Sequence, residues 1–232
     1  MIVTTSWDDG HALDERVAGL LAERGLKGTF YIPFQHPECG QIQPDLVRRL
    51  QAMGTEIGAH SMTHPDLRRL PSAVAQAEAR SSKVWLEQII GAEVPSFAFP
   101  FGYHNRRVAH AVAQAGFTLA RTLRYDHLRR PTHGLLAGVS VQAADASPLL
   151  VTRTWLDVRG PRGVLTDWST RAKRAFDVAR QRDGIWHLWG HSWEIERNHD
   201  WPRLVSVLDY VAGVPGVQYL TNGQALRPGS HA

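Results

Sequence analysis

Cysteine is nearly absent from this chain of 232 residues, in which Cys39 is the only example. A single thiol cannot form an intramolecular disulfide, so the sequence gives no sign of an oxidising compartment. The first residues also lack the basic segment followed by an apolar one that is typical of a secretory leader. We therefore expect a cytoplasmic protein.

Long apolar runs and basic clusters are missing as well. No apolar run approaches the roughly 18 residues that a membrane-spanning helix needs, so we expect no membrane partner. Lysine occurs only at positions 27, 83 and 173, and the arginines are scattered, with the densest groups at 128–130 and 171–174. Because a nucleic-acid surface needs a coherent stripe of cations, we expect no nucleic-acid partner either.

Strand-like apolar segments alternate with amphipathic helix-like segments along most of the chain. The predicted strands are 2–7, 27–32, 56–60, 96–101, 118–121, 185–190 and 217–220, and the predicted helices are 12–25, 44–54, 72–90, 105–116, 168–182 and 202–211. The segment 122–165 shows only short β-like pieces, such as 135–141. This alternation predicts an α/β fold with a parallel sheet, closed or nearly closed into a barrel of about seven to eight strands. The length suits a single domain, 1–232.

Unusual polar residues follow the predicted strands. Asp8 and Asp9 follow the first strand, His60 and His64 the third, and His191 the strand at 185–190. In a parallel barrel the carboxyl ends of all strands meet at one rim, where barrel enzymes carry their chemistry. The sequence therefore predicts that these side chains gather at one site.

Two histidine pairs have the spacing of metal ligands. His60 and His64 follow a strand, and a helix-like turn between them, or a tight loop before Pro65, would bring both imidazoles to one ion. His187 and His191 instead begin within a strand, where residues four apart lie about 13 Å from each other. With twelve histidines such pairs also arise by chance. We favour the first pair as ligands and disfavour the second.

The adjacent carboxylates Asp8 and Asp9 fit the same site. Two neighbouring carboxylates repel each other, and a divalent cation would relieve the repulsion, with one carboxylate as ligand and the other free as a base. The alternative is a helix cap, because Asp-Asp-Gly before a helix is also a common start signal. Taken alone, the motif would favour the cap.

The order of the segments SWDDG, HSMTH, FAFPFG and HLWGH resembles the polysaccharide deacetylase family, also called the NodB-homology or carbohydrate esterase family 4 group. The resemblance covers nearly the whole chain. It implies a distorted (β/α) barrel and metal-dependent removal of acetyl groups from N-acetylated sugars. It also implies that Asp8 is the general base, that Asp9, His60 and His64 hold the metal, and that His191 is the general acid.

Further positions take their expected roles from the same resemblance. Pro100, Phe101 and Gly102 correspond to the substrate-groove motif, in which the backbone N–H of Phe101 would face the oxyanion. Leu188 belongs with His191 to the leucine-histidine motif. The implied cofactor is a divalent metal ion, zinc in the first place, with cobalt, manganese or nickel as alternatives, and the implied partner is a carbohydrate or small acylamide substrate.

The chain departs from the family pattern at two places. Ala98 stands where the family has an arginine that pairs with the base. Arg121, at a neighbouring strand end, is our candidate to supply that guanidinium at the substrate site, against the alternative of a surface or structural arginine. Asp167 and Trp168 could be the family's Asp-Trp motif, or Asp167 could merely cap a helix. Trp193 could line the substrate groove or belong to the core.

Three functions are therefore compared. The first is a deacetylase of N-acetylated sugars that uses metal-activated water, an aspartate base and a histidine acid. The second is a hydrolase of cyclic imides or ureides on the same scaffold, for which the missing arginine leaves room. The third is a catalytically silent carbohydrate-binding protein, against which the retention of Asp8 argues, because a base has no role in metal binding.

Overall fold

Parallel strands form a ring in the computed structural model, which describes residues 1–38, 40–125, 135–145 and 167–226. Cys39 and most of the segment 122–165 lie outside these ranges. The strands are β1 (Ile2–Asp8), β2 (Gly28–Ile32), β5 (Glu56–Ala59), β6 (Ser96–Ala98), β7 (Leu119–Tyr125), β8 (Leu136–Val139), β9 (Val141–Gln142) and β10 (Ile185–Gly190). Their order in the sheet is β8-β7-β6-β5-β2-β1-β10-β9, and every neighbouring pair in it is parallel.

The two ends of this sheet meet at Ser140. β8 pairs with β7, β9 pairs with β10, and only Ser140 separates β8 from β9. The backbone N–H of Ser140 donates to the carbonyl of His187 over 3.0 Å, and its hydroxyl accepts from the N–H of His187 over 3.0 Å. A bent segment thus connects the two edges, which leaves few unpaired edge groups. The predicted barrel is confirmed.

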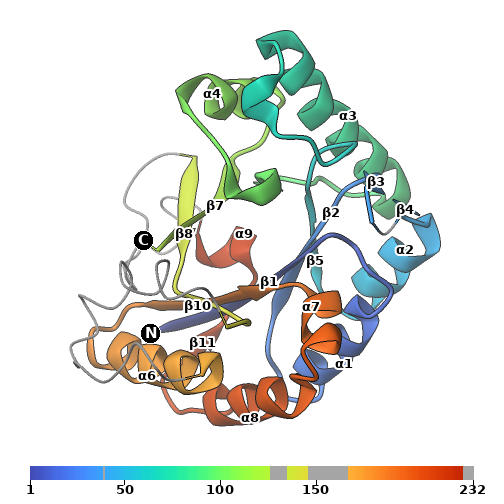
Figure 1. The fold of residues 1–232 in the computed structure, drawn as a ribbon. Coiled ribbons are helices and arrows are strands. Elements are labelled where there is room, and N and C mark those ends of the chain that lie inside the picture. Colours follow the sequence, from blue (N-terminus) through green and yellow to red (C-terminus); the bar gives the residue numbers. More distant parts are fainter. Residues whose placement is uncertain (39, 126–134, 146–166, 227–232) are drawn as a thin grey trace.

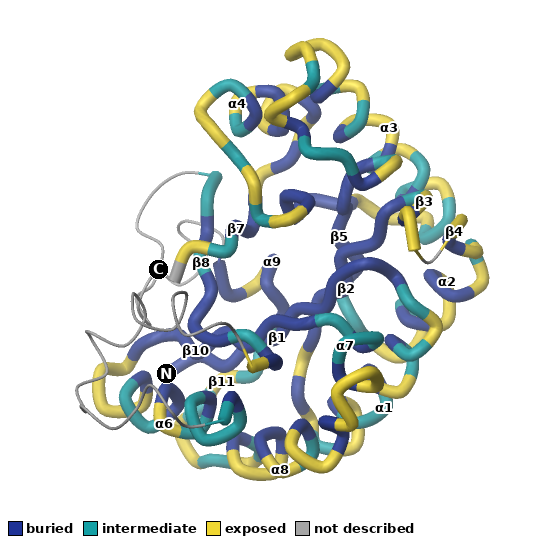
Figure 2. Tube along the Cα trace, viewed as in Figure 1, coloured by how far each residue is buried: buried dark blue, intermediate teal, exposed yellow. Residues whose placement is uncertain are grey.

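Helices cover the outside of the ring (Figure 1). They are α1 (Asp14–Ala22), α2 (Pro44–Ala52), α3 (Ser72–Ile90), α4 (Arg106–Gln114), α6 (Trp168–Gln181) and α8 (Trp201–Val211). Figure 2 shows buried strands inside and exposed residues on the outer helix faces. Outward-facing strand residues such as Val3, Trp7 and Phe30 are buried in the main apolar cluster. Within the described ranges, no helix has the length and hydropathy needed to cross a membrane.

Local signals explain where several helices begin and end. Asn105 caps α4 by accepting the backbone N–H of Val108 over 2.9 Å, and Asp167 caps α6 by accepting those of Ser169 and Thr170. α2 starts with Pro44, whose ring favours the first helical turn. α3 ends before Gly91, which adopts a left-handed conformation (φ 65°) that glycine tolerates without a steric penalty.

Several short elements lie outside the predicted pattern. They are the antiparallel hairpin β3 (Gln35–His36) and β4 (Gly40–Gln41), the 3₁₀ turns η1 (Leu67–Arg69) and η2 (Pro100–Gly102), α7 (Ser192–Arg197) and α9 (Asn222–Ala225). The predicted last strand, 217–220, is present as β11 (Gln218–Tyr219), which pairs with β1 in parallel. The predicted strand 96–101 ends at Ala98, because Phe101 has a positive φ of 58° and turns the chain into η2. The predicted strand 118–121 instead continues to residue 125.

One end of the ring is closed by α9, which lies inside the ring in Figure 1. Asn222 is fully buried there, accepts from the hydroxyl of Thr4 over 2.8 Å and donates its amide to the hydroxyl of Tyr31 over 3.0 Å. Ala225 and Leu226 pack on Ile2 in a second, smaller apolar cluster. The amino ends of the strands are therefore sealed, and the carboxyl ends are left for a site.

His187 lies within the barrel, away from the carboxyl rim. Its Nδ1 lies 3.2 Å from the carbonyl oxygen of Gly138, which can only accept, so Nδ1 carries the hydrogen and Nε2 accepts from the hydroxyl of Ser6 over 2.8 Å. Burial first, and then the charge of Arg121, lower the pKa of His187 to about 3. His187 is thus bonded at both nitrogens as a neutral ring, in keeping with our preference against His187 and His191 as a metal pair.

We predict that His187 makes the fold sensitive to acid. Between its unfolded pKa of 6.5 and its folded pKa of about 3, the unfolded imidazole takes a proton that the folded one does not, which favours unfolding by up to about 1.4 kcal/mol per pH unit. The free energy of unfolding of the parent should therefore fall by about 2 kcal/mol more than that of His187→Gln between pH 7 and pH 5. Urea titrations at both pH values measure this difference. Equal losses in the two proteins would contradict the prediction.

Candidate active site

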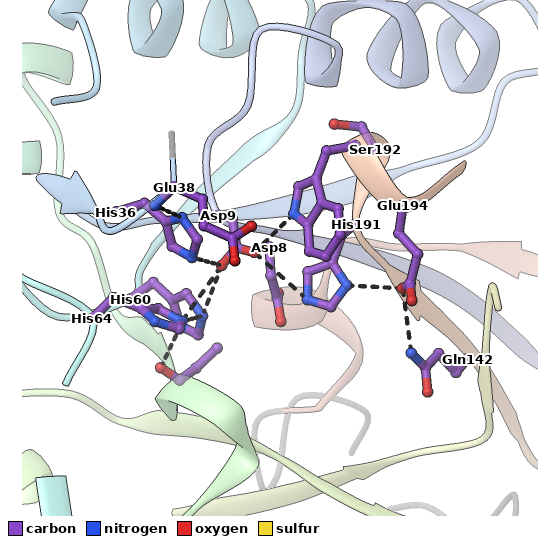
Figure 3. Close-up of polar contacts among 12 residues, drawn as sticks. Asp8, Asp9, His36, Glu38, His60, His64, Gln142, His191, Ser192 and Glu194 are labelled. Atoms are coloured by element: carbon purple, nitrogen blue, oxygen red, sulfur yellow. Dashed lines mark hydrogen bonds and ion pairs between the residues drawn. The ribbon is translucent and has the colours of Figure 1, made fainter. Parts of the chain in front are cut away.

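The carboxylate of Asp9 is the centre of a polar cluster at the carboxyl rim (Figure 3). Its Oδ1 lies 3.6 Å from Nε2 of His60 and 3.5 Å from Nε2 of His64, and these two nitrogens are 3.2 Å apart. All three side chains are at most 6% exposed. Among the described residues, Oδ1 of Asp9 has no hydrogen-bond partner. A buried carboxylate oxygen without a donor is costly, so this arrangement fits a cation.

The spacing of these three atoms fits one metal ion. A tetrahedral ion with ligand distances of about 2.0–2.2 Å holds its ligand atoms about 3.3–3.6 Å apart. The separations of 3.5 and 3.6 Å from Asp9 to the two histidines fall in this range, and the 3.2 Å between His60 and His64 lies just below it. One carboxylate and two imidazoles also form a ligand set that suits zinc and similar ions. The structure thus brings together the three side chains that the sequence nominates as ligands.

The histidines of the cluster are in the form that binds metals. His60 Nδ1 lies 2.8 Å from the carbonyl oxygen of Ala98, so it carries the hydrogen and leaves the Nε2 lone pair toward Asp9. Burial lowers the pKa of His60. Burial also lowers the pKa of His64, and with the repulsion from the neighbouring His60 it brings this pKa to about 3. Both rings are therefore neutral near pH 7. Burial alone would raise the pKa of Asp9, but its imidazole neighbours, His191 foremost, lower it.

The backbone of the site is held in uncommon conformations. Six non-glycine residues have a positive φ in the described part of the chain, and four of them, Asp9, Ser61, His64 and Phe101, are in the site or next to it. The left-handed conformations of Ser61 and His64 replace the helix-like turn considered for the histidine pair. Such conformations cost on the order of 1–3 kcal/mol each and persist only where the surroundings impose them.

Glu78 of α3 supplies part of that support for the loop between the two histidines. Its Oε2 accepts the backbone N–H groups of Met62 and Thr63, each over 3.0 Å, and its Oε1 accepts the hydroxyl of Thr63 over 3.0 Å. Three bonds from one helix side chain fix the loop between His60 and His64. The imidazoles are therefore positioned before any ligand arrives.

Asp8 forms a buried ion pair with Arg121. The guanidinium Nη2 donates to Oδ2 of Asp8, and the side chains are 5% exposed for Asp8 and 1% for Arg121. Arg121 lies on β7 and is the register partner of Ala98 on β6. Arg121 thus brings a guanidinium to Asp8 from the strand next to Ala98, the position where the resemblance leads us to expect an arginine. Oδ1 of Asp8 has no hydrogen-bond partner among the described residues.

His191 is oriented by Glu194, a residue whose role the sequence did not reveal. Nδ1 of His191 lies 3.1 Å from Oε2 of Glu194, three residues later in α7, and Nε2 lies 3.7 Å from Oδ2 of Asp9. Burial alone would lower the pKa of His191, but the Glu194 hydrogen bond and the Asp9 and Asp8 carboxylates outweigh it and raise the pKa. The ring is therefore stabilised in its protonated form.

Asp167 and Trp168 do not contact His191. Asp167 caps α6, and the pKa of its carboxyl is lowered to about 2 because hydrogen bonds from Ser169 and Thr170 outweigh its burial. Trp168 is fully buried and donates its indole N–H to Asp200 over 2.9 Å. The cap alternative is thus the correct interpretation of Asp167, and Glu194 holds the histidine instead.

The expected substrate residues border the cluster. Phe101, in η2 between Pro100 and Gly102, is 52% exposed and packs its ring 4.7 Å from that of His64. Trp193 donates its indole N–H to Oδ2 of Asp9 over 3.0 Å. It also lines a pocket of about 560 Å³ that extends to Glu38 on the β3–β4 hairpin, a volume that suits a small ligand.

His36 is the imidazole that the sequence did not reveal. It lies on β3, is 6% exposed, and places Nε2 3.6 Å from Oδ1 of Asp9 (Figure 3). Its ring contacts the His64 ring edge to face, with centroids 4.7 Å apart. The hairpin that carries it has strands of only two residues, so no periodicity marks it. Its position after the strand 27–32 is the only signal that could have suggested it.

The protein is thus a (β/α) barrel whose carboxyl rim gathers carboxylates and imidazoles that could hold a metal ion and transfer protons. The family model for polysaccharide deacetylase matches residues 1–120, more than half of the chain. The chain therefore belongs to the polysaccharide deacetylase family, whose members hydrolyse N-acetyl amide bonds, and the resemblance noted in the sequence is confirmed.

Individual relatives agree with this assignment. The chain is 30% identical to a chitin deacetylase of Pestalotiopsis sp over 128 residues, which are 53% of this chain and 43% of that protein. It is 33% identical to a chitooligosaccharide deacetylase of Bradyrhizobium sp. over 101 residues, which are 43% of this chain and 45% of that protein. The chain thus spans less than half the length of the curated relatives it matches.

Solved structures share the fold over nearly the whole chain. A Mycobacterium smegmatis protein assigned as a polysaccharide deacetylase matches with a TM-score of 0.72 and 17% identity, over 98% of this chain and 92% of that one. The chitin deacetylase of Colletotrichum lindemuthianum matches with a TM-score of 0.66 and 16% identity, over 98% and 88%. At these identities the likeness shows the fold, a distorted (β/α) barrel.

We predict that the Asp8–Arg121 pair supports the fold and that position 98 can replace position 121. Arg121→Ala should lower the free energy of unfolding by about 3–5 kcal/mol, because it leaves a buried carboxylate unpaired. Adding Ala98→Arg should recover at least half of that loss, since the two positions are neighbours on adjacent strands. Urea titration measures both changes.

The exposed Arg48, which pairs with Asp45 over 2.8 Å, provides the control. Arg48→Ala should change the free energy of unfolding by less than about 1 kcal/mol, as surface pairs contribute little. If Arg121→Ala were as stable as this control, or if Ala98→Arg gave no recovery, the relocated-arginine interpretation would be wrong.

Proposed function

We propose that the chain is a metal-dependent hydrolase that removes acetyl or related acyl groups from N-acylated sugars. The observation that carries this proposal is Oδ1 of Asp9, which has no hydrogen-bond partner among the described residues and faces the Nε2 atoms of His60 and His64 at 3.6 and 3.5 Å. The same rim holds a paired carboxylate, Asp8, and an oriented imidazole, His191. Together these groups could activate water, stabilise an oxyanion and protonate the departing nitrogen, which are the three tasks of amide hydrolysis.

Asp9, His60 and His64 would hold the ion, with zinc, cobalt, manganese and nickel all compatible with the ligand set. When bound, the ion would polarise the acyl carbonyl and lower the pKa of a nearby water. Among the described residues, only the indole N–H of Trp193 donates a hydrogen bond to the Asp9 carboxylate. It bonds Oδ2 over 3.0 Å. Oδ1 is thereby left as the ligand atom.

Asp8 and His191 would move the protons. Arg121 holds Oδ2 of Asp8, so Oδ1 is the atom that accepts a proton from the attacking water. As the water oxygen bonds to the acyl carbon, the carbonyl becomes an oxyanion that the backbone N–H of Phe101 would help to stabilise. Nε2 of His191 then donates to the departing nitrogen as the C–N bond breaks, and a carboxylic acid and an amine result.

The first test combines metal content with activity. Protein purified without chelator should contain one divalent ion per chain and should release acetate from N-acetylglucosamine oligomers. Asp9→Asn should lose the ion, whereas His110→Ala, which removes an exposed histidine of α4, should keep it. Protein without metal that stays inactive after addition of Zn²⁺ or Co²⁺ would contradict the proposal. Activity on small ureides but none on chitin oligomers would change the substrate to the imide or ureide class.

Asp8→Asn separates an enzyme from a silent binding protein. It should keep the metal and lower kcat by about 10²–10⁴-fold, the usual contribution of a positioned general base. Metal content is measured by elemental analysis and kcat by acetate release. Equal turnover in the parent and Asp8→Asn would show that Asp8 is not the base.

We predict that Glu194→Gln lowers kcat by about tenfold while KM and metal content stay near the parent values. Glu194 acts through His191, and an amide orients the imidazole less strongly than a carboxylate does. Glu196→Gln in the same helix is the control, because the Glu196 side chain is 56% exposed and pairs with Arg16 and Trp201 rather than with His191. Equal kcat in the two variants would show that Glu194 does not support His191 as the general acid.

A further inference from the structure

Asp14 carries a buried carboxyl group that the proposed reaction does not use. It is the first residue of α1 and is fully buried. Its Oδ1 accepts the hydroxyl of Ser192, which is fully buried as well, over 2.5 Å. Its Oδ2 has no hydrogen-bond partner among the described residues. Placing a carboxyl group in the interior with one bonded oxygen is costly, so the fold has to gain something from this contact.

Ser192 connects Asp14 to the expected general acid. His191 is the residue directly before α7, and Ser192 is the first residue of that helix. The carbonyl of His191 accepts the backbone N–H of Glu194 over 3.1 Å, and the side chain of Glu194 orients the imidazole. A contact at Ser192 therefore restrains both members of the His191–Glu194 pair through one short helix.

The two helices that meet at this contact are anchored to different extents. α1 buries Val17, Ala18 and Leu21 in the main apolar cluster. α7 has 6 residues and buries only Ser192 and Ile195. Isolated helices shorter than about 12 residues have little stability of their own, so tertiary contacts have to fix α7. Asp14 is thus on the anchored side of the contact, and His191 is next to the side that depends on it.

We propose that Asp14 is a positioning residue that, through Ser192, holds His191 in place to protonate the departing nitrogen. The inference rests on the proposed function and adds two supporting residues to it. The indole N–H of Trp193 makes a second bond between the same segments, to Oδ2 of Asp9 over 3.0 Å. Both bonds join the segment after β1 to the segment after β10, and Nε2 of His191 lies 3.7 Å from Asp9. The acid and the candidate metal ligand are thereby kept at one separation.

The surroundings of Asp14 favour its uncharged form. Burial raises the pKa of its carboxyl group well above the usual range, and the charges of Asp9 and Asp8 act in the same direction, against the hydrogen bond from Ser192. The contact therefore depends on a hydrogen-bonding oxygen at this position and does not need a negative charge. An asparagine, which keeps a side-chain oxygen, should be able to replace the aspartate.

A double-mutant cycle tests the inference by acetate release from N-acetylglucosamine oligomers. The variants are Ser192→Ala, Asp14→Ala, the double variant and Asp14→Asn. Ser96→Ala is the matched control, because this fully buried serine also donates its hydroxyl to a carboxylate, Oε1 of Glu56, over 2.8 Å, but at the amino end of the barrel. Elemental analysis gives the metal content, and urea midpoints identify any variant that does not fold.

Ser192→Ala and Asp14→Ala should each lower kcat about tenfold, because a displaced acid slows the step in which it donates its proton. KM and metal content should stay within about twofold of the parent, since the acid acts in the transition state. The double variant should lose no more than either single variant, as all three remove the same contact. Asp14→Asn should recover at least about threefold of the kcat lost in Asp14→Ala.

The inference is wrong if Ser192→Ala keeps the kcat of the control Ser96→Ala, or if the two single losses multiply to about 100-fold in the double variant. It is also wrong if KM rises or metal is lost while kcat is unchanged, or if Asp14→Asn is as slow as Asp14→Ala. Should Asp14→Ala not fold, the comparison of Ser192→Ala with Ser96→Ala still decides. These results leave the proposed function standing, whereas a metal-loaded parent that releases no acetate would reject the proposed function and this inference together.

Discussion

The burial of two adjacent carboxylates at the end of β1 is the constraint on which the rest of the site depends. Asp8 and Asp9 are each only 3% exposed, and neither charge could be tolerated there without partners. Side chains alternate along a strand, so the two carboxylates diverge from the start. The positive φ of 81° at Asp9 then turns its carboxylate toward the rim, while Asp8 stays directed into the barrel.

The divergence explains why the two carboxylates take different partners. Asp8 meets a permanent cation, Arg121, whose guanidinium also lies 5.2 Å from the Tyr31 ring and 5.3 Å from the Trp189 ring. Asp9 meets imidazoles and an indole N–H. A fixed guanidinium keeps a carboxylate in place, whereas neutral imidazoles leave room for a cation that comes from solution. One residue is thereby suited to proton transfer and the other to metal binding.

Sequence reasoning located the parts of the site that follow from strand ends. Asp9, His60 and His191 each follow a predicted strand of a parallel barrel, and that topology alone requires them to meet. His36 was not predicted because its strand has only two residues and shows no periodicity. Its approach to Asp9 also depends on a hairpin that only tertiary contacts define. Glu194 was not predicted because a helix of 6 residues is too short to show a clear hydrophobic periodicity in the sequence.

Other expectations depended on backbone geometry that a sequence does not display. The spacing of His60 and His64 suggests a helix-like turn between them. The loop is shaped instead by the left-handed conformations of Ser61 and His64 and by hydrogen bonds to the carboxylate of Glu78. The arginine missing at Ala98 could be traced to Arg121 because the two positions lie on neighbouring predicted strands. The pairing of Arg121 with Asp8, however, required the register of β6 and β7.

The backbone partner of Nδ1 sorts the buried histidines into different chemical states. Carbonyl groups of Ala98 and Gly138 take the Nδ1 hydrogens of His60 and His187, so each ring presents a lone pair at Nε2. In His187 the hydroxyl of Ser6 uses that lone pair, whereas in His60 it faces Asp9. An N–H partner at Nδ1 of His36 reverses the assignment. Residues of one type therefore serve as structural acceptor and as candidate ligand, and the hydrogen-bonding character of a peptide group at Nδ1 makes the choice.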